Sequence, residues 1–127
     1  MICSFSRPTL FKIRLPFFNA LGDILCLLSD TPDETWGLVV NEAMACGMPV
    51  IVSESCGCVP DLVAGKGTGW AVPPGDLEAT IRTIKTAIAR RSSWTSMGEN
   101  GRAVIANHTF PRMAEGILAA LASVDAK

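Results

Sequence analysis

The chain has 127 residues, a length that fits one domain and leaves no room for a second. Hydrophobic residues make up 49% and charged residues 18%, which is ample for one core and excludes a disordered tail. Eleven Lys and Arg against twelve Asp and Glu leave a net charge of −1, which excludes the basic footprint of a nucleic-acid-binding protein and a polybasic membrane patch.

The sequence favours a cytoplasmic protein with reduced thiols. No apolar run reaches the roughly 18–20 residues of a membrane-spanning helix, and residues 1–14 hold no continuous apolar stretch of signal-peptide length. The five cysteines are an odd number without a two-residue gap between any pair, so no zinc or redox motif is predicted. We expect small buried thiols, plus two in a loop at Cys56 and Cys58.

The first half of the chain predicts a βαβ unit. Residues 1–14 are left unassigned, and the apolar run 23–28 predicts a parallel strand that is apolar on both faces and buried. Residues 37–46 favour a helix that stops at Gly47, and residues 50–52 predict a second strand. Strand, loop, helix and strand together predict an α/β fold, a Rossmann-like parallel sheet with flanking helices.

The second half predicts one more strand and three helices. Residues 70–72 form a short strand, and Asp76 is a good N-cap for the helix that follows. A helix around residues 94–105 is weakened by Gly98 and Gly101, and a last helix follows Pro111. Apolar residues recur at helical spacing in the first and last of these helices, and we expect them in the core: Leu77, Ile81, Ile84, Ile88, Met113, Ile117, Leu118 and Leu121.

The residues that can carry chemistry gather at the start of the first predicted helix. Glu34 lies in the loop after a strand's carboxyl end, where open parallel sheets bind ligands. Because Gly37 opens the helix, the backbone N–H groups of Gly37, Leu38 and Val39 offer a seat for a phosphate. Glu42 follows about a turn and a half later and can accept hydrogen bonds from two hydroxyls. This pattern fits a ligand that carries both phosphate and sugar.

The same spacing also allows a purely structural interpretation. A glutamate in the first helical turns complements the helix dipole, and a glutamate in a loop is usually solvated. The sequence contains no glycine-rich phosphate motif of the dinucleotide or Walker type. That observation argues against NAD binding and ATP hydrolysis, but not against other nucleotides.

The segment resembles the Glu-x7-Glu signature of retaining glycosyltransferases with the GT-B architecture, the group called glycosyl transferases group 1. Glu34 and Glu42 have the required spacing, and the run between them begins Thr35-Trp36-Gly37-Leu38, which matches the family's small-aromatic-Gly-aliphatic run. The family's helix-to-strand continuation is matched by residues 42–51. The resemblance implies that residues 15–127 form part of the C-terminal, nucleotide-sugar-binding domain.

The resemblance also implies a role for each residue of the segment. Glu34 would be the catalytic residue, close to the reacting carbon of the donor sugar, and Glu42 would bind the nucleotide ribose. The other donor-binding residues would be Trp36, Gly37, Leu38 and Val39, the last three through backbone N–H groups that hold the donor phosphate. No metal site and no cofactor are implied, because the nucleotide sugar is a substrate and no metal is obligatory.

An N-terminal domain that binds the sugar or lipid-linked acceptor is expected in this family and is missing from the sequence. The Arg and Lys pair that normally contacts the diphosphate is also missing, so we expect a truncated donor domain. The resemblance implies hexosyl transfer with retention, typically in polysaccharide biosynthesis, and leaves peripheral association with a membrane open. Two other interpretations stand: a non-catalytic nucleotide-sugar-binding remnant or partner subunit, and an α/β interaction domain without a ligand.

Overall fold

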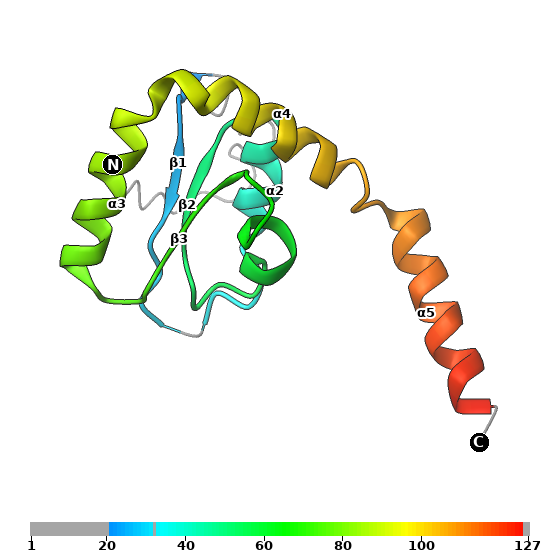
Figure 1. The fold of residues 1–127 in the computed structure, drawn as a ribbon. Helices are drawn as coiled ribbons and strands as arrows, with labels where there is room; N and C mark the ends of the chain where they lie inside the picture. Colours follow the sequence, from blue (N-terminus) through cyan, green and yellow to red (C-terminus); the bar gives the residue numbers. More distant parts are fainter. Residues whose placement is uncertain (1–20, 32, 126–127) are drawn as a thin grey trace, which may run out of the picture.

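The computed structural model describes residues 21–31 and 33–125 of the chain, so the unassigned segment 1–14 lies outside the described residues. Three strands, β1 (Leu25–Leu27), β2 (Val50–Ser53) and β3 (Gly69–Val72), form one parallel sheet in the order β1-β2-β3 (Figure 1). Helix α2 (Leu38–Ala45) connects β1 to β2. The predicted βαβ unit and parallel α/β sheet are therefore confirmed.

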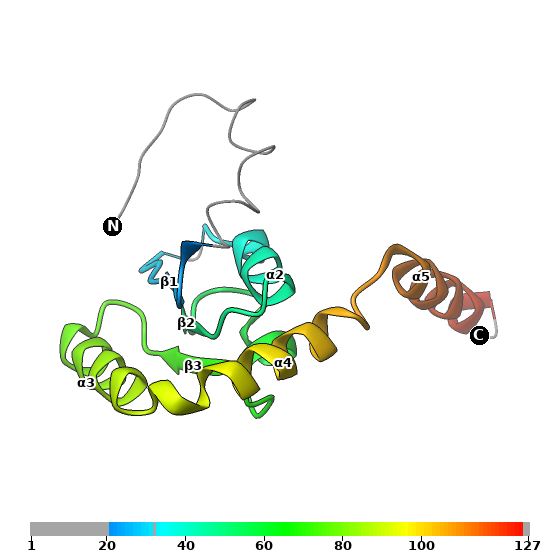
Figure 2. The same cartoon turned by 90° about the horizontal axis from the view of Figure 1, so that it is seen from above.

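The remaining helices flank the sheet and extend beyond it. They are the π-helix η1 (Val59–Val63), α3 (Leu77–Ala89), the 3-10 helix η2 (Arg91–Ser93), α4 (Trp94–Ile105) and α5 (Phe110–Asp125). Helices α2 and α3 lie on opposite sides of the sheet, whereas α5 projects away from it in both views (Figures 1 and 2). Among the described residues, no helix is long and apolar enough to cross a membrane.

The sheet separates two cores, and β2 contributes to both. Val50 and Val52 pack under α2 and η1, whereas Ile51 points to the other side, where Val72 and Ala87 complete a smaller core beneath α3. This alternation follows from the two-residue period of a strand. All four residues of β2 are buried, as expected for the central strand of a sheet covered on both faces.

Strand β1 is less buried than its apolar sequence predicts. Cys26 is exposed, and Leu28, directly after the strand, is 44% exposed. In the sheet register Cys26 pairs with Ile51 and therefore faces the side on which α3 lies. Helix α3 packs against β3, at the other edge of the sheet. The prediction of a strand buried on both faces is wrong for β1.

The expectation that the apolar stripes of α3 and α5 lie in the core is wrong for α5. In α3 it holds for Ile84, which is half-buried against the smaller core, but not for the rest of the stripe. Ala87 is the buried residue of α3, while Leu77 and Ile88 are 71% and 61% exposed. Every residue of α5 from Phe110 to Val124 is exposed. Periodicity correctly predicts a helix in both places, but it does not say which surface covers the stripe.

Helix α4 packs closely against the C-terminal end of α2 at two glycines, Gly98 and Gly101. A Cβ on Gly98 would overlap the carbonyl oxygen of Gly47, and one on Gly101 would lie 3.4 Å from Cβ of Met44. Arg102 Nη2 donates a hydrogen bond to the carbonyl oxygen of Cys46 at 2.8 Å, in the same contact. The two glycines, which looked like weak points in the sequence, are the positions that allow this close crossing.

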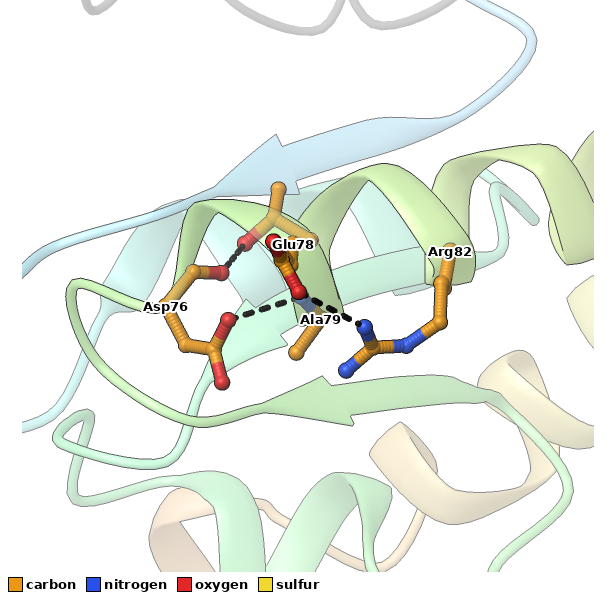
Figure 3. Close-up of polar contacts among 5 residues, drawn as sticks. Asp76, Glu78, Ala79 and Arg82 are labelled. Atoms are coloured by element: carbon orange, nitrogen blue, oxygen red, sulfur yellow. Dashed lines mark hydrogen bonds and ion pairs between the residues drawn. The ribbon is translucent and has the colours of Figure 1, made fainter.

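Asp76 caps α3 as predicted. Its Oδ1 accepts a hydrogen bond from the backbone N–H of Ala79 at 2.8 Å (Figure 3). The carbonyl oxygen of Asp76 accepts a second bond, from the hydroxyl of Thr80 at 2.8 Å. Side chain and main chain of one residue thus fix the first turn of the helix.

Candidate functional site

The Glu34–Gly37 segment leads from the carboxyl end of β1 into α2. Gly37 is the N-cap of α2 and has φ 91° and ψ 58°, a left-handed conformation that glycine adopts at little cost. A Cβ on Gly37 would lie 3.1 Å from Cδ2 of Leu27 and 3.5 Å from Sγ of Cys58. The helix start predicted at Gly37 is confirmed, and both conformation and space require glycine there.

Helix α2 begins with backbone donors that its own carbonyls do not satisfy. The N–H of Val40 donates to the carbonyl oxygen of Gly37 at 2.9 Å and begins the helical ladder. The N–H groups of Gly37, Leu38 and Val39 precede this ladder, and Gly37 has no side chain with which to cap them. Leu38 is 71% exposed, so this end of the helix faces solvent. An anion can bind at such a helix start.

The two glutamates lie on either side of this helix start along the chain. Glu34 is half-buried in the loop before it, and Glu42 is exposed on α2. Glu42 follows Leu38 by four residues, so the two side chains share the exposed face of the helix. Glu34 therefore lies before the helix start and Glu42 within the helix, with the unsatisfied N–H groups between them in sequence.

Trp36 is engaged within the protein. Its indole Nε1 donates to Oδ1 of Asn41 at 2.8 Å, and its carbonyl oxygen accepts from the N–H of Cys58 at 3.1 Å. The ring packs against the core under α2. Its indole N–H is thus occupied, and only the ring is left for contact with a donor. Asn41 was not predicted from the sequence, because a polar residue five positions after an aromatic one is a weak signal.

The Ser53–Cys58 loop lies beside the Glu34–Gly37 segment, although the sequence analysis gave it no role. It follows the carboxyl end of β2, which is hydrogen-bonded to β1. Ser55 Oγ donates to the carbonyl oxygen of Ser29 at 2.8 Å, and Ser53 Oγ lies 2.9 Å from Ser55 Oγ. The loop is thereby tied to the chain leaving β1. Loops that follow neighbouring parallel strands meet at one edge of the sheet. This rule could have predicted that the Ser53–Cys58 loop lies beside the Glu34–Gly37 segment.

The two thiols of this loop are buried, whereas Cys26 on β1, which was expected to be buried, is exposed. Burial, followed by the charges of the neighbouring Cys56, Glu34 and Asp61, raises the pKa of Cys58 to about 11. Burial also raises the pKa of Cys56, with a smaller contribution from the charge of Glu34. Both thiols are therefore neutral at physiological pH and close to the Glu34 carboxylate.

Two hollows lie near the candidate site, and Glu34 and Glu42 line neither of them. A hollow of about 680 Å³ lies between Trp36 and residues 107–113, which lead into α5. Another of about 220 Å³ lies at the carboxyl edge of the sheet, between Asp30, Ser53 and the start of α3. Within residues 21–31 and 33–125, no group of three or more His, Cys, Asp or Glu side chains could hold a metal ion. Trp36 is thus a predicted donor residue that lines a hollow.

Residues 13–104 match the protein family described as Glycosyl transferases group 1. The chain belongs to this family. It is 36% identical over 87 residues to sulfoquinovosyl transferase SQD2 of Arabidopsis thaliana, across 65% of this chain and 16% of that protein. It is 31% identical over 93 residues to the capsular polysaccharide biosynthesis glycosyltransferase CapM of Staphylococcus aureus, across 73% of this chain and 23% of that protein.

The fold of this group 1 chain also matches a solved structure. It resembles the crystal structure of Anabaena Alr3699/HepE in complex with UDP-glucose, with a TM-score of 0.67 and 26% sequence identity. The match covers 86% of this chain and 30% of that one. The chain thus spans less than a third of the length of each of these relatives.

The family match covers the candidate site and ends before the last helix. The Glu34–Gly37 segment, α2 and the Ser53–Cys58 loop all lie within residues 13–104, whereas α5 lies beyond them. Membership in the group 1 family therefore applies to the part of the molecule in which the two glutamates and the Gly37 cap lie.

Proposed function

We propose that this chain is the donor-binding part of a retaining glycosyltransferase that uses a nucleotide sugar. The observation that carries the proposal is the left-handed cap at Gly37, which puts backbone donors between Glu34 and Glu42 in sequence. The relative whose structure contains UDP-glucose supports a UDP-sugar as the first donor to test.

Each group of the site has a separate task in this proposal. The N–H groups of Gly37, Leu38 and Val39 hold the donor phosphate, and they stabilise the negative charge that grows on it as the leaving group departs. Glu34 contacts the sugar hydroxyls, and its carboxylate stabilises positive charge at the anomeric carbon. Glu42 accepts hydrogen bonds from the ribose hydroxyls.

The reaction replaces one bond to the anomeric carbon by another. The bond from this carbon to the phosphate oxygen breaks, and the nucleoside diphosphate keeps the electron pair. A hydroxyl oxygen of the acceptor forms the new bond on the same face, which gives retention, and its proton is released. Proton NMR of the product, which distinguishes α from β anomers, tests this stereochemistry.

Donor binding is proposed to need no metal, because the start of α2 already supplies N–H donors and the positive end of a helix dipole. We expect the affinity for UDP-glucose to be the same in EDTA and in magnesium. A loss of binding in EDTA that magnesium restores would refute this part of the proposal.

The acceptor is proposed to bind outside this chain's site. Because the chain spans less than a third of its relatives, the sugar or lipid-linked acceptor is assigned to an additional domain or partner chain. By analogy with the capsular polysaccharide relative, the protein is proposed to act in the cytoplasm. Where its acceptor is lipid-linked, it is proposed to contact the membrane peripherally.

Calorimetric titration with UDP-, GDP- and ADP-sugars, combined with donor hydrolysis, tests the roles of the two glutamates. We expect Glu42→Ala to weaken donor binding about tenfold, which corresponds to about 1.4 kcal/mol, with little effect on turnover of bound donor. Glu34→Gln should lower turnover far more than affinity. Glu99→Gln on α4, which is exposed and outside the site, is the matched control. Equal losses for Glu34→Gln and Glu42→Ala would reject this division of roles.

A second candidate function is a non-catalytic module that binds a nucleotide sugar through the same backbone donors at the start of α2. Donor binding without release of sugar, with and without acceptors present, would support this alternative. If no donor produces heat at millimolar concentration, the chain is better described as an interaction domain without a ligand.

A further inference from the structure

We propose that Gly57 is a positioning residue, through which the Ser53–Cys58 loop presses on the Glu34–Gly37 segment and sets the start of α2. The contact joins two backbone segments of this chain, at Gly57 and at Thr35. Its consequence for donor binding rests on the proposed function, because it assumes that the start of α2 holds the donor phosphate. No partner or ligand is needed for the contact to form.

Gly57 is required at its position by close approach. A Cβ there would overlap the carbonyl oxygen of Thr35, and it would lie 3.6 Å from Cα of Trp36. The backbone of Gly57 does not have the positive φ that five other glycines of the described chain have. The sign of its φ therefore does not demand glycine, and the limit is the space left by the Thr35–Trp36 peptide.

Cys58, the next residue, stabilises this contact through its backbone hydrogen bonds. Its N–H donates to the carbonyl oxygen of Trp36 at 3.1 Å, and its own carbonyl oxygen accepts from the N–H of Leu62 in η1 at 2.8 Å. Its side chain is fully buried, and its Sγ would lie 3.5 Å from a Cβ on Gly37. Cys58 thus joins η1 to both residues that precede α2.

The Glu34–Gly37 segment is packed against β1 at its last residue. Leu27 of β1 is close enough to be 3.1 Å from a Cβ on Gly37. The register of β1 with β2 fixes the position of that strand in the sheet. A methyl group at position 57 would overlap the carbonyl oxygen of Thr35, so it would displace Thr35 and Trp36, and with them the N–H groups that begin α2.

Gly98→Ala provides a matched control for a merely structural effect. There too a Cβ would overlap a backbone carbonyl oxygen, that of Gly47, but at the opposite end of α2. Both substitutions should lower the thermal midpoint, because both force two backbone segments apart. Only Gly57→Ala should disturb the start of α2.

Fluorine NMR of protein labelled with fluorotryptophan measures the displacement directly. The chain has three tryptophans, so three signals are expected, and the loss of one in Trp36→Phe assigns Trp36. We expect Gly57→Ala to shift the Trp36 signal and leave that of Trp94 in place. Below both thermal midpoints, Gly57→Ala should also weaken UDP-glucose binding about tenfold while Gly98→Ala changes it less than about twofold.

A second pair of variants serves if Gly57→Ala does not fold. Cys58 has φ −77°, which proline can adopt, so Cys58→Pro removes the N–H donated to Trp36 and places the ring Cδ against the Trp36 carbonyl oxygen. Cys58→Ala removes the same thiol but keeps that N–H. We expect the proline variant, and not the alanine variant, to shift the Trp36 signal and weaken donor binding.

The outcomes separate this proposal from the proposed function. An unmoved Trp36 signal in Gly57→Ala overturns the positioning role. A shifted signal with unchanged UDP-glucose affinity shows a contact that does not set the donor site, and so overturns the consequence. If the unaltered protein does not bind any donor, the proposed function fails, and the consequence fails with it. The Trp36 signal still decides whether Gly57 positions the segment.

Discussion

The indole N–H of Trp36 donates to the side-chain oxygen of Asn41 across the left-handed Gly37, with a donor–acceptor distance of 2.8 Å. The bond joins the residue before the helix cap to the first turn of α2. Because Gly37 has no side chain, this bond holds together the two sides of the cap. The geometry of the helix start is therefore built from Trp36 and Asn41 as much as from Gly37.

Removing either partner of this bond should destabilise the fold by a similar amount. Trp36→Phe keeps most of the ring but removes the donor, and Asn41→Ala removes the acceptor. We expect the double variant to lose less stability than the sum of the single variants, by about 0.5–1.5 kcal/mol. Urea denaturation of the four proteins measures this coupling. The pair Trp70→Phe and Asn41→Ala, which is not hydrogen-bonded, should be additive, and additivity for Trp36 as well would contradict the prediction.

Gly37→Ala should damage the site more than the fold. The left-handed conformation costs a residue with a Cβ about 1–2 kcal/mol, and the methyl group would also meet Leu27 at 3.1 Å. Gly75 is the control, because its φ of 71° is also positive but its surroundings are empty within 4 Å. We expect Gly75→Ala to lower stability by the backbone cost alone, while Gly37→Ala lowers it further and abolishes donor binding. If Gly37→Ala and Gly75→Ala had equal effects on stability and on donor binding, the prediction would be contradicted.

The β1–α2–β2 unit could be predicted from the sequence because the residues that start and stop its elements act locally. Gly37 begins the helix, Gly47 stops it with φ 80°, and Pro49 prevents its continuation, each through its own backbone preference. Glu34 and Glu42 were placed correctly on either side of the helix start for the same reason. Their roles in donor binding stay predictions.

The sequence could not predict which surfaces cover which stripes. The contact of Gly57 with Thr35 joins loops that are far apart along the chain, and only the packing of two strand ends brings them together. Likewise, Leu77 and Ile88 have the spacing of core residues, yet α3 buries only Ala87. Periodicity describes one helix, whereas burial depends on a second element whose position the period does not encode.

Asp76→Ala should destabilise α3 by about 1 kcal/mol, the usual loss for an N-cap side chain. The substitution removes the carboxylate that accepts from Ala79 (Figure 3), while the bond from the Thr80 hydroxyl to the main-chain carbonyl of residue 76 remains. Glu78→Gln is the control, because its ion pair with Arg82 spans 3.5 Å and both side chains are exposed. We expect the control to change stability by less than about 0.5 kcal/mol. Thermal unfolding followed by circular dichroism measures both.

Stability should fall in alkali through the buried thiol of Cys58. Its pKa rises from the usual 9.0 to about 11 in the folded protein, mainly because the side chain is buried. Between these two values the unfolded chain has lost a proton that the folded protein keeps, so the free energy of unfolding decreases as pH rises. The contribution is complete below about pH 9 and lost as pH passes through about 11.

Urea denaturation at a series of pH values measures this loss for the unaltered protein and for Cys58→Ala, which has no thiol to ionise at this position. We expect the stability difference between them to shrink by about 1–2 kcal/mol across that window. Glu34→Gln removes one of the charges that raise the pKa of Cys58, so the same loss should be complete at a lower pH in that variant. If the stability difference between the unaltered protein and Cys58→Ala does not change with pH, the pKa of Cys58 is the same in the folded and the unfolded protein. That result would contradict the prediction.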